Sequence, residues 1–355
     1  MGTRDKFFRA MRREDNGYVP FEFGLCPALQ KKFEEKSGTT DYVGYYGFPV
    51  RSAAPRCKIT EDRFSKYFPG KAGTEGFSIN REWGMGAAAG SVAHFSHMEP
   101  SMGGFTRMEE FESYPFPDPV RDYDWEHFQP QVDGIKRQDA IAVAPMETTL
   151  FEVSWYMRGM ENFMMDMIES PEIAEFLLDR ACEIRCEFAR RYALAGCDVL
   201  RLGDDVSTQL DMMMSPEQYR AFLKPRLAKV IKAAKDAKPD MLIFYHGDGN
   251  LQKVIPDLIE VGVEILNPIQ PECMDPAEIK RKYGSRLSFW GTLGTQTTMP
   301  FGTPEDVRGE CMKRIEDVGH DGGLFLAPSH ILEPEVPWEN VEAFVAAVAE
   351  YNGRR

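Results

Sequence analysis

The chain lacks long apolar runs, an excess of basic residues and paired-cysteine motifs. No apolar run approaches the roughly 18 residues that a membrane helix needs, so a membrane protein is not expected. The 355 residues carry a formal charge of −14 at pH 7, which argues against a nucleic-acid-binding protein because such proteins need a basic field. The seven cysteines form no CxxC pair, which argues against a disulfide framework and fits a reducing compartment.

Two further signals are missing from the N-terminal part of the chain. Residues 1–15, MGTRDKFFRAMRRED, contain no apolar core of a secretory signal, so we expect a cytoplasmic protein. No Gly-x-Gly-x-x-Gly motif follows the first expected strand, and GMGAAAG at 84–90 has neither its spacing nor a clean buried strand before it. This absence argues against an open, doubly wound sheet that binds a dinucleotide.

Short apolar runs alternate with amphipathic stretches from residue 138 onward. Strands that alternate with helices form parallel sheets, and eight such units close into a barrel. We therefore predict an α/β fold, a (β/α)8 TIM-type barrel with an elaborated N-terminal region. Residues 1–135 are expected to form the N-terminal part of the barrel with an irregular insertion over its mouth, and residues 136–355 the regular βα units. Strands are expected near residues 19, 140, 198, 241, 264, 287 and 324, with an eighth hidden between 25 and 135.

The stretch at 241–250, MLIFYHGDGN, joins a strand directly to a polar turn. An apolar run bounded by glycine is typical of a buried strand, so His246 and Asp248 are expected just past its carboxyl end. In parallel α/β proteins, functional sites are built at this edge of the sheet. The alternative interpretation is structural, with His246 capping the turn and Asp248 capping a helix that begins near Leu251.

Other expected strands end in the same way, and a barrel gathers such ends at one mouth. Converging carboxylates and imidazoles are typical of a catalytic or metal site. His246, Asp248 and His330 match the nitrogen and oxygen ligands of a zinc site or of a non-haem iron site. Without a metal, the same histidines would bind substrate or shuttle protons. The polar residues at these ends are Glu147, Asp204, Asp205, His246, Asp248, Asn267, Gln270, Thr292, Ser329 and His330.

Several stretches resemble the uroporphyrinogen decarboxylase superfamily in their order and spacing. In the C-terminal half they are YHGDGNLQKVIPDLIEVGVEILNPIQPECMDP, FWGTLGTQ with the TPEDV that follows, and GGLFLAPSH followed by PWEN. GDDVSTQ, SPEQYRAFLKPRL and the N-terminal DKFFRAMRREDNGYVPFEFG also fit, whereas residues 25–135 fit mostly through REWG and the YPFPDP linker. The resemblance implies a distorted (β/α)8 barrel, which agrees with the strand count.

This superfamily contains two chemistries, and the resemblance favours one of them. The decarboxylase branch holds substrate carboxylates with an arginine-rich N-terminal signature, and VPFEFGLCPALQKK stands at that place without those arginines. The other branch transfers methyl groups to or from a corrinoid protein, with zinc held by an HxC motif and a later cysteine. Here His246 matches the histidine, while Asp248 and His330 stand where the two cysteines would be. Such harder ligands resemble methyltransferases that act on oxygen-bound methyl groups.

The resemblance therefore implies a corrinoid-dependent methyltransferase. It would move a methyl group from an oxygen-bound, methoxyaromatic donor to a cob(I)alamin-carrying partner protein, assisted by a zinc-type site of His246, Asp248 and His330. The alternatives are a metal-free decarboxylase of the same fold, with Asp204, Asp205 and His246 as acid and base, and a non-catalytic binding protein. A homodimer is the candidate assembly.

The remaining polar residues are assigned expected roles. Glu147, Asp204 and Asp205 are the expected catalytic residues or further metal ligands. His94 and His97, on an apparent loop, are weaker candidates for the site. The expected substrate contacts are Asn267, Gln270, Thr292 and Ser329.

Overall fold

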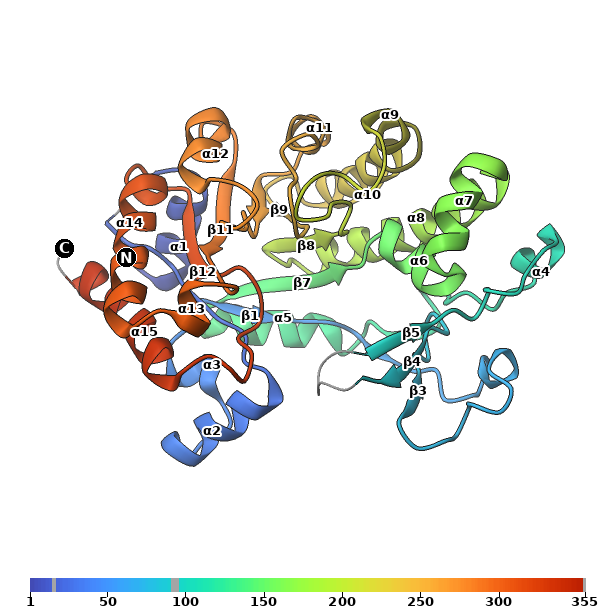
Figure 1. The fold of residues 1–355 in the computed structure, drawn as a ribbon, viewed down its shortest axis with the longest axis horizontal. Coiled ribbons are helices and arrows are strands. Elements are labelled where there is room, and N and C mark those ends of the chain that lie inside the picture. The colour runs from blue at the N-terminus through green and yellow to red at the C-terminus, as the bar shows by residue number, and fades with distance from the viewer. Residues whose placement is uncertain (15–16, 91–95, 354–355) are drawn as a thin grey trace.

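The structure is a computed structural model that describes residues 1–14, 17–90 and 96–353. It is built on a parallel sheet that curls into most of a barrel (Figure 1). Every pair of neighbouring strands in this sheet is parallel, which confirms the predicted α/β fold and barrel architecture. In spatial order the strands are β1 (Val50–Ser52), β7 (Ile141–Glu147), β8 (Val199–Gly203), β9 (Leu242–His246), β10 (Ile265–Asn267), β11 (Ser288–Leu293) and β12 (Leu324–Pro328).

The two edges of the sheet show which N-terminal segments complete the barrel. At one edge β1 pairs with β7, so β1 is the eighth strand that was expected between residues 25 and 135. At the other edge, Phe21 meets Leu326 of β12 through a single parallel bridge. The regular strand predicted at 19–24 is therefore wrong, because Pro20 has no N–H with which to extend the ladder.

Helices cover the outside of the sheet and alternate with its strands, as predicted (Figure 1). Ser215, Asp275 and Thr303 each accept a backbone N–H in the first turn of a helix and act as its N-cap. Within the described residues, no helix combines the length and the apolar character that crossing a membrane requires. The helices from residue 128 onward are α5 (Phe128–Arg137), α6 (Phe151–Arg158), α7 (Met160–Glu169), α8 (Pro171–Leu194), α9 (Pro216–Gln218), α10 (Lys224–Ala237), α11 (Ile255–Val261), α12 (Pro276–Tyr283), α13 (Thr298–Phe301), α14 (Pro304–Gly319) and α15 (Trp338–Gly353).

Two helical stretches are divided into shorter segments. The first breaks at Gly159, whose φ of +88° favours glycine, and this break separates α6 from α7. The second contains a π-helical segment, Tyr219–Leu223, between α9 and α10. Pro225 follows this segment and cannot donate the hydrogen bond that a regular α-helix needs there.

The elaborated N-terminal region carries a small antiparallel sheet on the side of the carboxyl end of β7 (Figure 1). Arg158 of α6 holds the chain that follows this sheet, donating to the carbonyl oxygens of Met102 at 2.9 Å and Phe105 at 3.0 Å. The division of the chain near residue 135 and an insertion over the mouth stay predictions. The elements of this region are α1 (Thr3–Met11), α2 (Pro27–Ser37), α3 (Tyr42–Tyr45), β2 (Arg56–Cys57), the 3-10 turn Ser65–Tyr67, β3 (Phe77–Ile79), β4 (Gly86–Ala89), β5 (Ser96–Glu99), α4 (Met108–Glu112) and β6 (Tyr123–Asp124).

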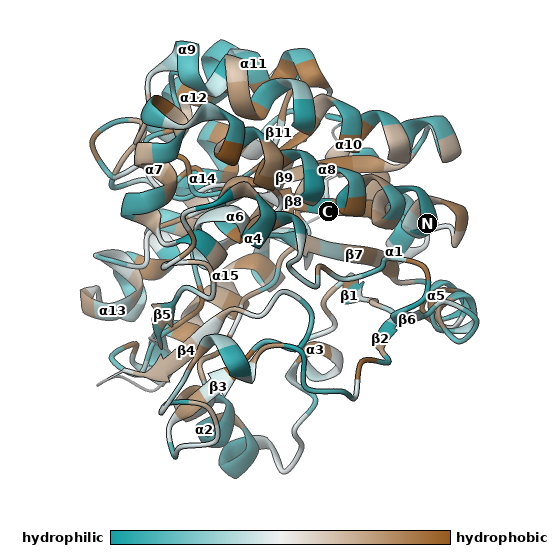
Figure 2. Cartoon of the chain, turned by 90° about the vertical axis from the view of Figure 1, so that its right-hand side faces the viewer, coloured by the Kyte–Doolittle hydropathy of each residue, from teal (hydrophilic) through white to brown (hydrophobic). Residues whose placement is uncertain are grey.

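Helix α1 closes the amino-terminal end of the barrel. Its Ala10 carbonyl oxygen accepts the N–H of Gly323, immediately before β12. The ring of Phe7 enters the barrel, with its centroid 6.1 Å from the rings of both Trp290 and Phe325, which are stacked 3.7 Å apart. Figure 2 shows the strands around β8 and β9 as mostly hydrophobic, in brown. With this end packed, the carboxyl ends of the strands are left to form a site.

We expect Phe7→Ala to destabilise the fold by about 3–5 kcal/mol, because a large aromatic side chain is lost from a packed interior. Phe8→Ala removes the same group from the same helix at a partly buried position and is expected to cost much less. Thermal unfolding followed by circular dichroism compares the two. Equal midpoints for both variants would contradict the role of Phe7 in closing the barrel.

Candidate functional site

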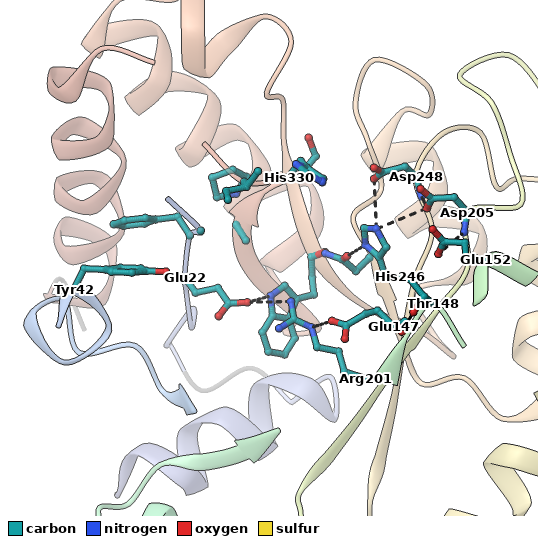
Figure 3. Close-up of a pocket in the computed structure, with 18 of the residues that line it drawn as sticks. Glu22, Tyr42, Glu147, Thr148, Glu152, Arg201, Asp205, His246, Asp248 and His330 are labelled. Carbon is teal, nitrogen blue, oxygen red and sulfur yellow. Dashed lines mark hydrogen bonds and ion pairs between the residues drawn. The ribbon is translucent and has the colours of Figure 1, made fainter. Parts of the chain in front are cut away.

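A cavity of about 580 Å³ lies at the carboxyl ends of the barrel strands (Figure 3). Its position is the one predicted for the site, because parallel strands bring their carboxyl ends to one rim. Of the predicted site residues, seven line this cavity: Glu147, Asp205, His246, Asp248, Asn267, Ser329 and His330.

His246 is the last residue of β9, and the neighbouring strand fixes its ring. Asn267 is its register partner on β10, and His246 Nδ1 lies 2.6 Å from Asn267 Oδ1. The Asn267 amide donates to the Trp290 carbonyl oxygen at 2.7 Å, so its own oxygen faces His246. Nδ1 therefore donates its proton to Asn267, and the Nε2 lone pair faces the cavity. Metal-binding histidines use this arrangement, in which a second group orients the ring.

Asp205 and Asp248 stand beside this Nε2 atom. It lies 3.7 Å from Asp205 Oδ1 and 3.9 Å from Asp248 Oδ1, and one ligand atom from each of the three residues lies within 4.8 Å of the others. The ligands of a tetrahedral zinc ion lie about 3.4 Å apart, so small side-chain movements complete a three-ligand site. The Asp248 N–H donates to Asp205 Oδ1 at 2.8 Å and ties the two loops together. This donor set fits a divalent cation of the zinc type.

Gly203, the last residue of β8, makes room for His246. A Cβ atom at position 203 would lie 2.6 Å from the His246 carbonyl oxygen and 2.7 Å from its Cβ. Real Cβ atoms do not approach that closely, so a side chain here would displace β9. The sequence alone does not distinguish Gly203, because a glycine before two aspartates is also typical of an ordinary turn.

His330 does not join the group of potential ligands. It is exposed and lies across the cavity from Asp205 (Figure 3). The Ser329 N–H donates to the Leu293 carbonyl oxygen at 2.8 Å and holds the loop after β12 on that side. Burial raises the pKa of Asp248, and His330 is among the groups that oppose this rise. The compact group therefore contains Asp205 in place of the predicted ligand His330.

Asp204, a predicted catalytic residue, is turned into the protein and does not line the cavity. It is buried and accepts the N–H groups of Leu150 and Glu152 at 3.0 Å, at the start of α6. A carboxylate in this place satisfies N–H groups that have no partner within the helix. Burial raises the pKa of Asp204, and the two N–H groups oppose the rise. Asp204 therefore holds the start of α6, and its catalytic role stays a prediction.

The predicted substrate contacts are distributed unevenly. Thr292, which was expected just after a strand, lies within β11 and is fully buried. Gln270 lines a second cavity of about 560 Å³ beside the first, and Ser329 lines both. Asn267 lines the first cavity, but its amide is engaged in orienting His246. Ser329 is therefore the predicted contact that is best placed to meet a ligand.

Glu147, the third predicted catalytic residue, belongs with Arg201 and Glu22 to a charged group that we call the floor of the cavity. Arg201 Nε lies 3.0 Å from Glu147 Oε1, and Arg201 Nη2 lies 3.6 Å from Glu22 Oε1. Glu22 also accepts the indole N–H of Trp290 at 2.9 Å. Burial raises the pKa of Glu22, and Arg201 opposes the rise. Glu22 and Arg201 were not among the predicted site residues, although each is a single charge within an apolar run, VPFEFG or VLRLG.

Glu152 and Tyr156 of α6 form the wall beside Asp205. The Tyr156 hydroxyl donates to Glu152 Oε1 at 3.1 Å, and the Asp205 N–H lies 3.3 Å from Glu152 Oε2. Burial raises the pKa of Glu152, and the carboxylates of Asp204 and Asp205 raise it further. The sequence did not reveal this pair, because polar residues four apart on a helix usually face solvent.

Aromatic rings form the wall opposite these carboxylates. Phe23 and Tyr42 stack with centroids 6.1 Å apart and an interplanar angle of 17°. Tyr46 and Phe48 pack edge-on against Phe23, at 5.1 and 4.9 Å. Tyr42 extends toward the cavity from the far side of Glu22 (Figure 3). A flat ligand ring finds an apolar surface here.

The two weaker histidine candidates do not add to this arrangement. His97 lies on β5 in the small antiparallel sheet, where it is the register partner of Ala88, and it does not line the cavity. His94 lies outside the described residues.

Comparisons with known proteins agree with the fold. Methylcobamide:CoM methyltransferase MtaA of Methanosarcina barkeri is 29% identical over 194 residues, which cover 54% of this chain and 53% of that protein. Methylated-thiol–coenzyme M methyltransferase of Methanosarcina mazei is 28% identical over 226 residues, which cover 61% of this chain and 55% of that protein. The chain thus spans about half the length of these curated relatives.

A solved structure and a family model complete the comparison. The structure, a methyltransferase from Methanosarcina mazei, superposes with a TM-score of 0.68 at 20% identity and covers 99% of both chains, so the two share a fold. The model of uroporphyrinogen decarboxylase (URO-D) matches residues 86–351, which is most of this chain. On this match, the chain belongs to the uroporphyrinogen decarboxylase family.

Proposed function

We propose that this protein is a corrinoid-dependent methyltransferase. It moves a methyl group from an oxygen-bound, methoxyaromatic donor to cob(I)alamin on a partner protein, and it uses a zinc-type site. The observation that carries the proposal is the convergence of Asp205, His246 and Asp248 on one point of a cavity with an aromatic wall. A homodimer stays a prediction.

The type of ligand supports an oxygen-bound donor. The two methyltransferase relatives are named for methylcobamide, coenzyme M and methylated thiols, which supports methyl transfer that involves a corrinoid. Soft sulfur ligands suit sulfur chemistry, whereas carboxylate and imidazole ligands suit harder oxygen groups. Two carboxylates beside His246 therefore favour a donor whose methyl group leaves from oxygen.

Different residues of the cavity would bind the metal ion and the methyl donor. Asp205, His246 and Asp248 would hold the ion, and Asn267 orients the His246 ring so that its Nε2 lone pair faces the cavity. The aromatic wall that includes Tyr42 binds the donor ring. When bound, zinc supplies a Lewis acid for the oxygen that loses the methyl group. In the transfer the carbon–oxygen bond breaks, the carbon bonds to cobalt with the electron pair of cobalt(I), and the oxygen keeps its own pair and later takes a solvent proton.

The decarboxylase alternative finds no support in the cavity. A porphyrinogen carries many carboxylates and needs several cations to bind. Among the described residues that line the cavity, Arg201 is the one Arg or Lys, and Glu22 and Glu147 both pair with it. The binding of a polycarboxylate would require that these ion pairs break.

Metal analysis tests the ligand set. We expect His246→Ala, Asp205→Asn and Asp248→Asn each to lose bound zinc, because each removes one of three converging ligand atoms. His330→Ala removes an imidazole from the same cavity and is expected to keep the metal. Zinc content is measured by mass spectrometry after dialysis. Full zinc content in His246→Ala would reject the site, and zinc loss in His330→Ala would restore His330 as a ligand.

A second prediction concerns the residue behind His246. Asn267→Leu keeps the approximate size of the side chain but removes the oxygen that accepts the Nδ1 proton. We expect about 10–100-fold weaker zinc binding, the usual effect of losing such an orienting group. Competition with a chromophoric chelator measures the affinity, and Ser329→Ala is the control on the same cavity. Unchanged affinity in Asn267→Leu would mean that His246 is oriented by other contacts.

Methyl transfer to cob(I)alamin is tested under anaerobic conditions. Zinc-loaded protein is incubated with cob(I)alamin and a panel of methoxylated aromatics, and the corrinoid spectrum is followed. We expect conversion to the methyl form with the natural protein and at least about a hundredfold slower conversion with His246→Ala, because a Lewis acid stabilises the departing oxygen by several kcal/mol. Conversion at equal rates in both proteins would reject a role for the metal site.

A further inference from the structure

The cavity carries more negative charge than the proposed metal site uses. Its lining contains five carboxylates, a single arginine and no lysine among the described residues. The carboxylates come from five different segments, so the charge is a property of the folded cavity and not of one acidic stretch. They are Glu22, Glu147, Glu152, Asp205 and Asp248.

Arg201, the single arginine, is already engaged. Its guanidinium lies between Glu147 and Glu22, at 3.0 and 3.6 Å. Its central carbon also lies 4.9 Å from the ring centroid of Phe244 and 5.6 Å from that of Trp290. A carboxylated ligand therefore has to break an ion pair before it can use this residue. Such a ligand would then lie close to the carboxylates of Glu147 and Glu22, which have lost their ion-pair partner and repel it.

A bound metal ion does not reverse this balance. A dication held by Asp205 and Asp248 is neutralised by these two carboxylates. The rest of the lining then contains Glu22, Glu147 and Glu152 against Arg201, which is three carboxylates and one cation.

The carboxylates of the floor lie next to aromatic rings. Burial raises the pKa of Tyr42, and the charge of Glu22 raises it further, as expected for groups that lie close together. Tyr42 stacks with Phe23 on the same wall. Ammonium groups bind well where an aromatic face and a carboxylate lie close together, because both attract positive charge. Carboxylate groups are repelled by both.

We propose that the methyl donor carries a positively charged ammonium group, which binds between Glu22 and the aromatic wall of Phe23 and Tyr42, and that the cavity excludes donors that carry a carboxylate. This inference rests on the proposed function and names the charge of its substrate. The ring and its methoxy oxygen then extend toward Asp205, His246 and Asp248, on the opposite side of the cavity (Figure 3).

Three probes with one methoxyphenol ring and side chains of different charge test the proposal. They are 3-methoxytyramine, which is cationic, 4-ethylguaiacol, which is neutral, and homovanillate, which is anionic. Isothermal titration of the zinc-loaded protein is expected to give at least about tenfold tighter binding of the cation than of the anion, with the neutral probe between them. The difference is expected to shrink between about 50 mM and about 500 mM NaCl, because salt screens exposed charge. Equal binding of all three probes, or tighter binding of homovanillate, would overturn the proposal.

Glu22→Gln is the matched variant. A glutamine oxygen can still accept the indole N–H of Trp290, so the shape of the cavity is kept while one charge is lost. We expect about fivefold weaker binding of 3-methoxytyramine and unchanged binding of 4-ethylguaiacol. Glu260→Gln removes the same charge from the outer surface, where Glu260 pairs with Lys224, and is expected to change neither. If Glu22→Gln weakens the binding of the cationic and the neutral probe equally, the shape of the cavity and not its charge sets the affinity. This result would also overturn the proposal.

These titrations separate the inference from the proposed function. Charge selectivity in binding without any methylation of cob(I)alamin would support a cavity that prefers cationic ligands and reject the methyltransferase proposal. Methylation of cob(I)alamin that is as fast with homovanillate as with 3-methoxytyramine would support the methyltransferase and reject the charge selectivity.

Discussion

The hydrogen bond between His246 and Asn267 is the constraint on which the candidate site depends. It exists because β9 and β10 are aligned so that these two residues are register partners. A shift of one residue in this alignment would send one of the two side chains to the other face of the sheet. The Trp290 carbonyl oxygen of β11 fixes the Asn267 amide in turn, so three neighbouring strands set the direction of one imidazole.

The amino-terminal end of the barrel is packed with side chains that stabilise the fold, whereas the carboxyl ends of the strands carry the cavity. Phe7 of α1 fills the amino-terminal end, where its ring meets Trp290 and Phe325. Trp290 also faces the upper cavity through its N–H, which donates to Glu22. One residue thus links the packed interior to the floor of the cavity. The usual division of TIM-type barrels, with a stable lower end and a reactive upper end, accounts for this arrangement.

The charges of the cavity favour cationic ligands over the polycarboxylate substrates that a decarboxylase of this fold would bind. Polycarboxylate substrates require unpaired cations, and here Arg201 is held between two glutamates. A cavity rich in carboxylates instead suits a bound cation, either a metal ion at Asp205 and Asp248 or an ammonium group near the floor. Fold membership alone therefore does not decide the reaction, because the reaction depends on the side chains at the strand ends.

The sequence by itself determined the barrel and the edge of the sheet that carries the site. Alternating apolar runs and glycine-bounded strand ends such as YHGDGN are local patterns, and local patterns can be read without coordinates. They were sufficient to place His246 and Asp248 beside each other. The same patterns did not reveal that β1 completes the sheet, because a three-residue strand in an irregular region carries too little signal.

Only the tertiary structure decided which strand ends face each other and which turn inward. Asp204 and Asp205 are adjacent in the sequence, yet Asp204 is buried under α6 while Asp205 faces the cavity, because successive side chains near a strand end point in opposite directions. Asp205 lies beside His246 and Asp248 whereas His330 does not, and the loop that carries His330 is hydrogen-bonded to the N-terminal segment through Leu332, Gly24 and Cys26. These outcomes depend on contacts between distant segments, which no local pattern in the sequence records.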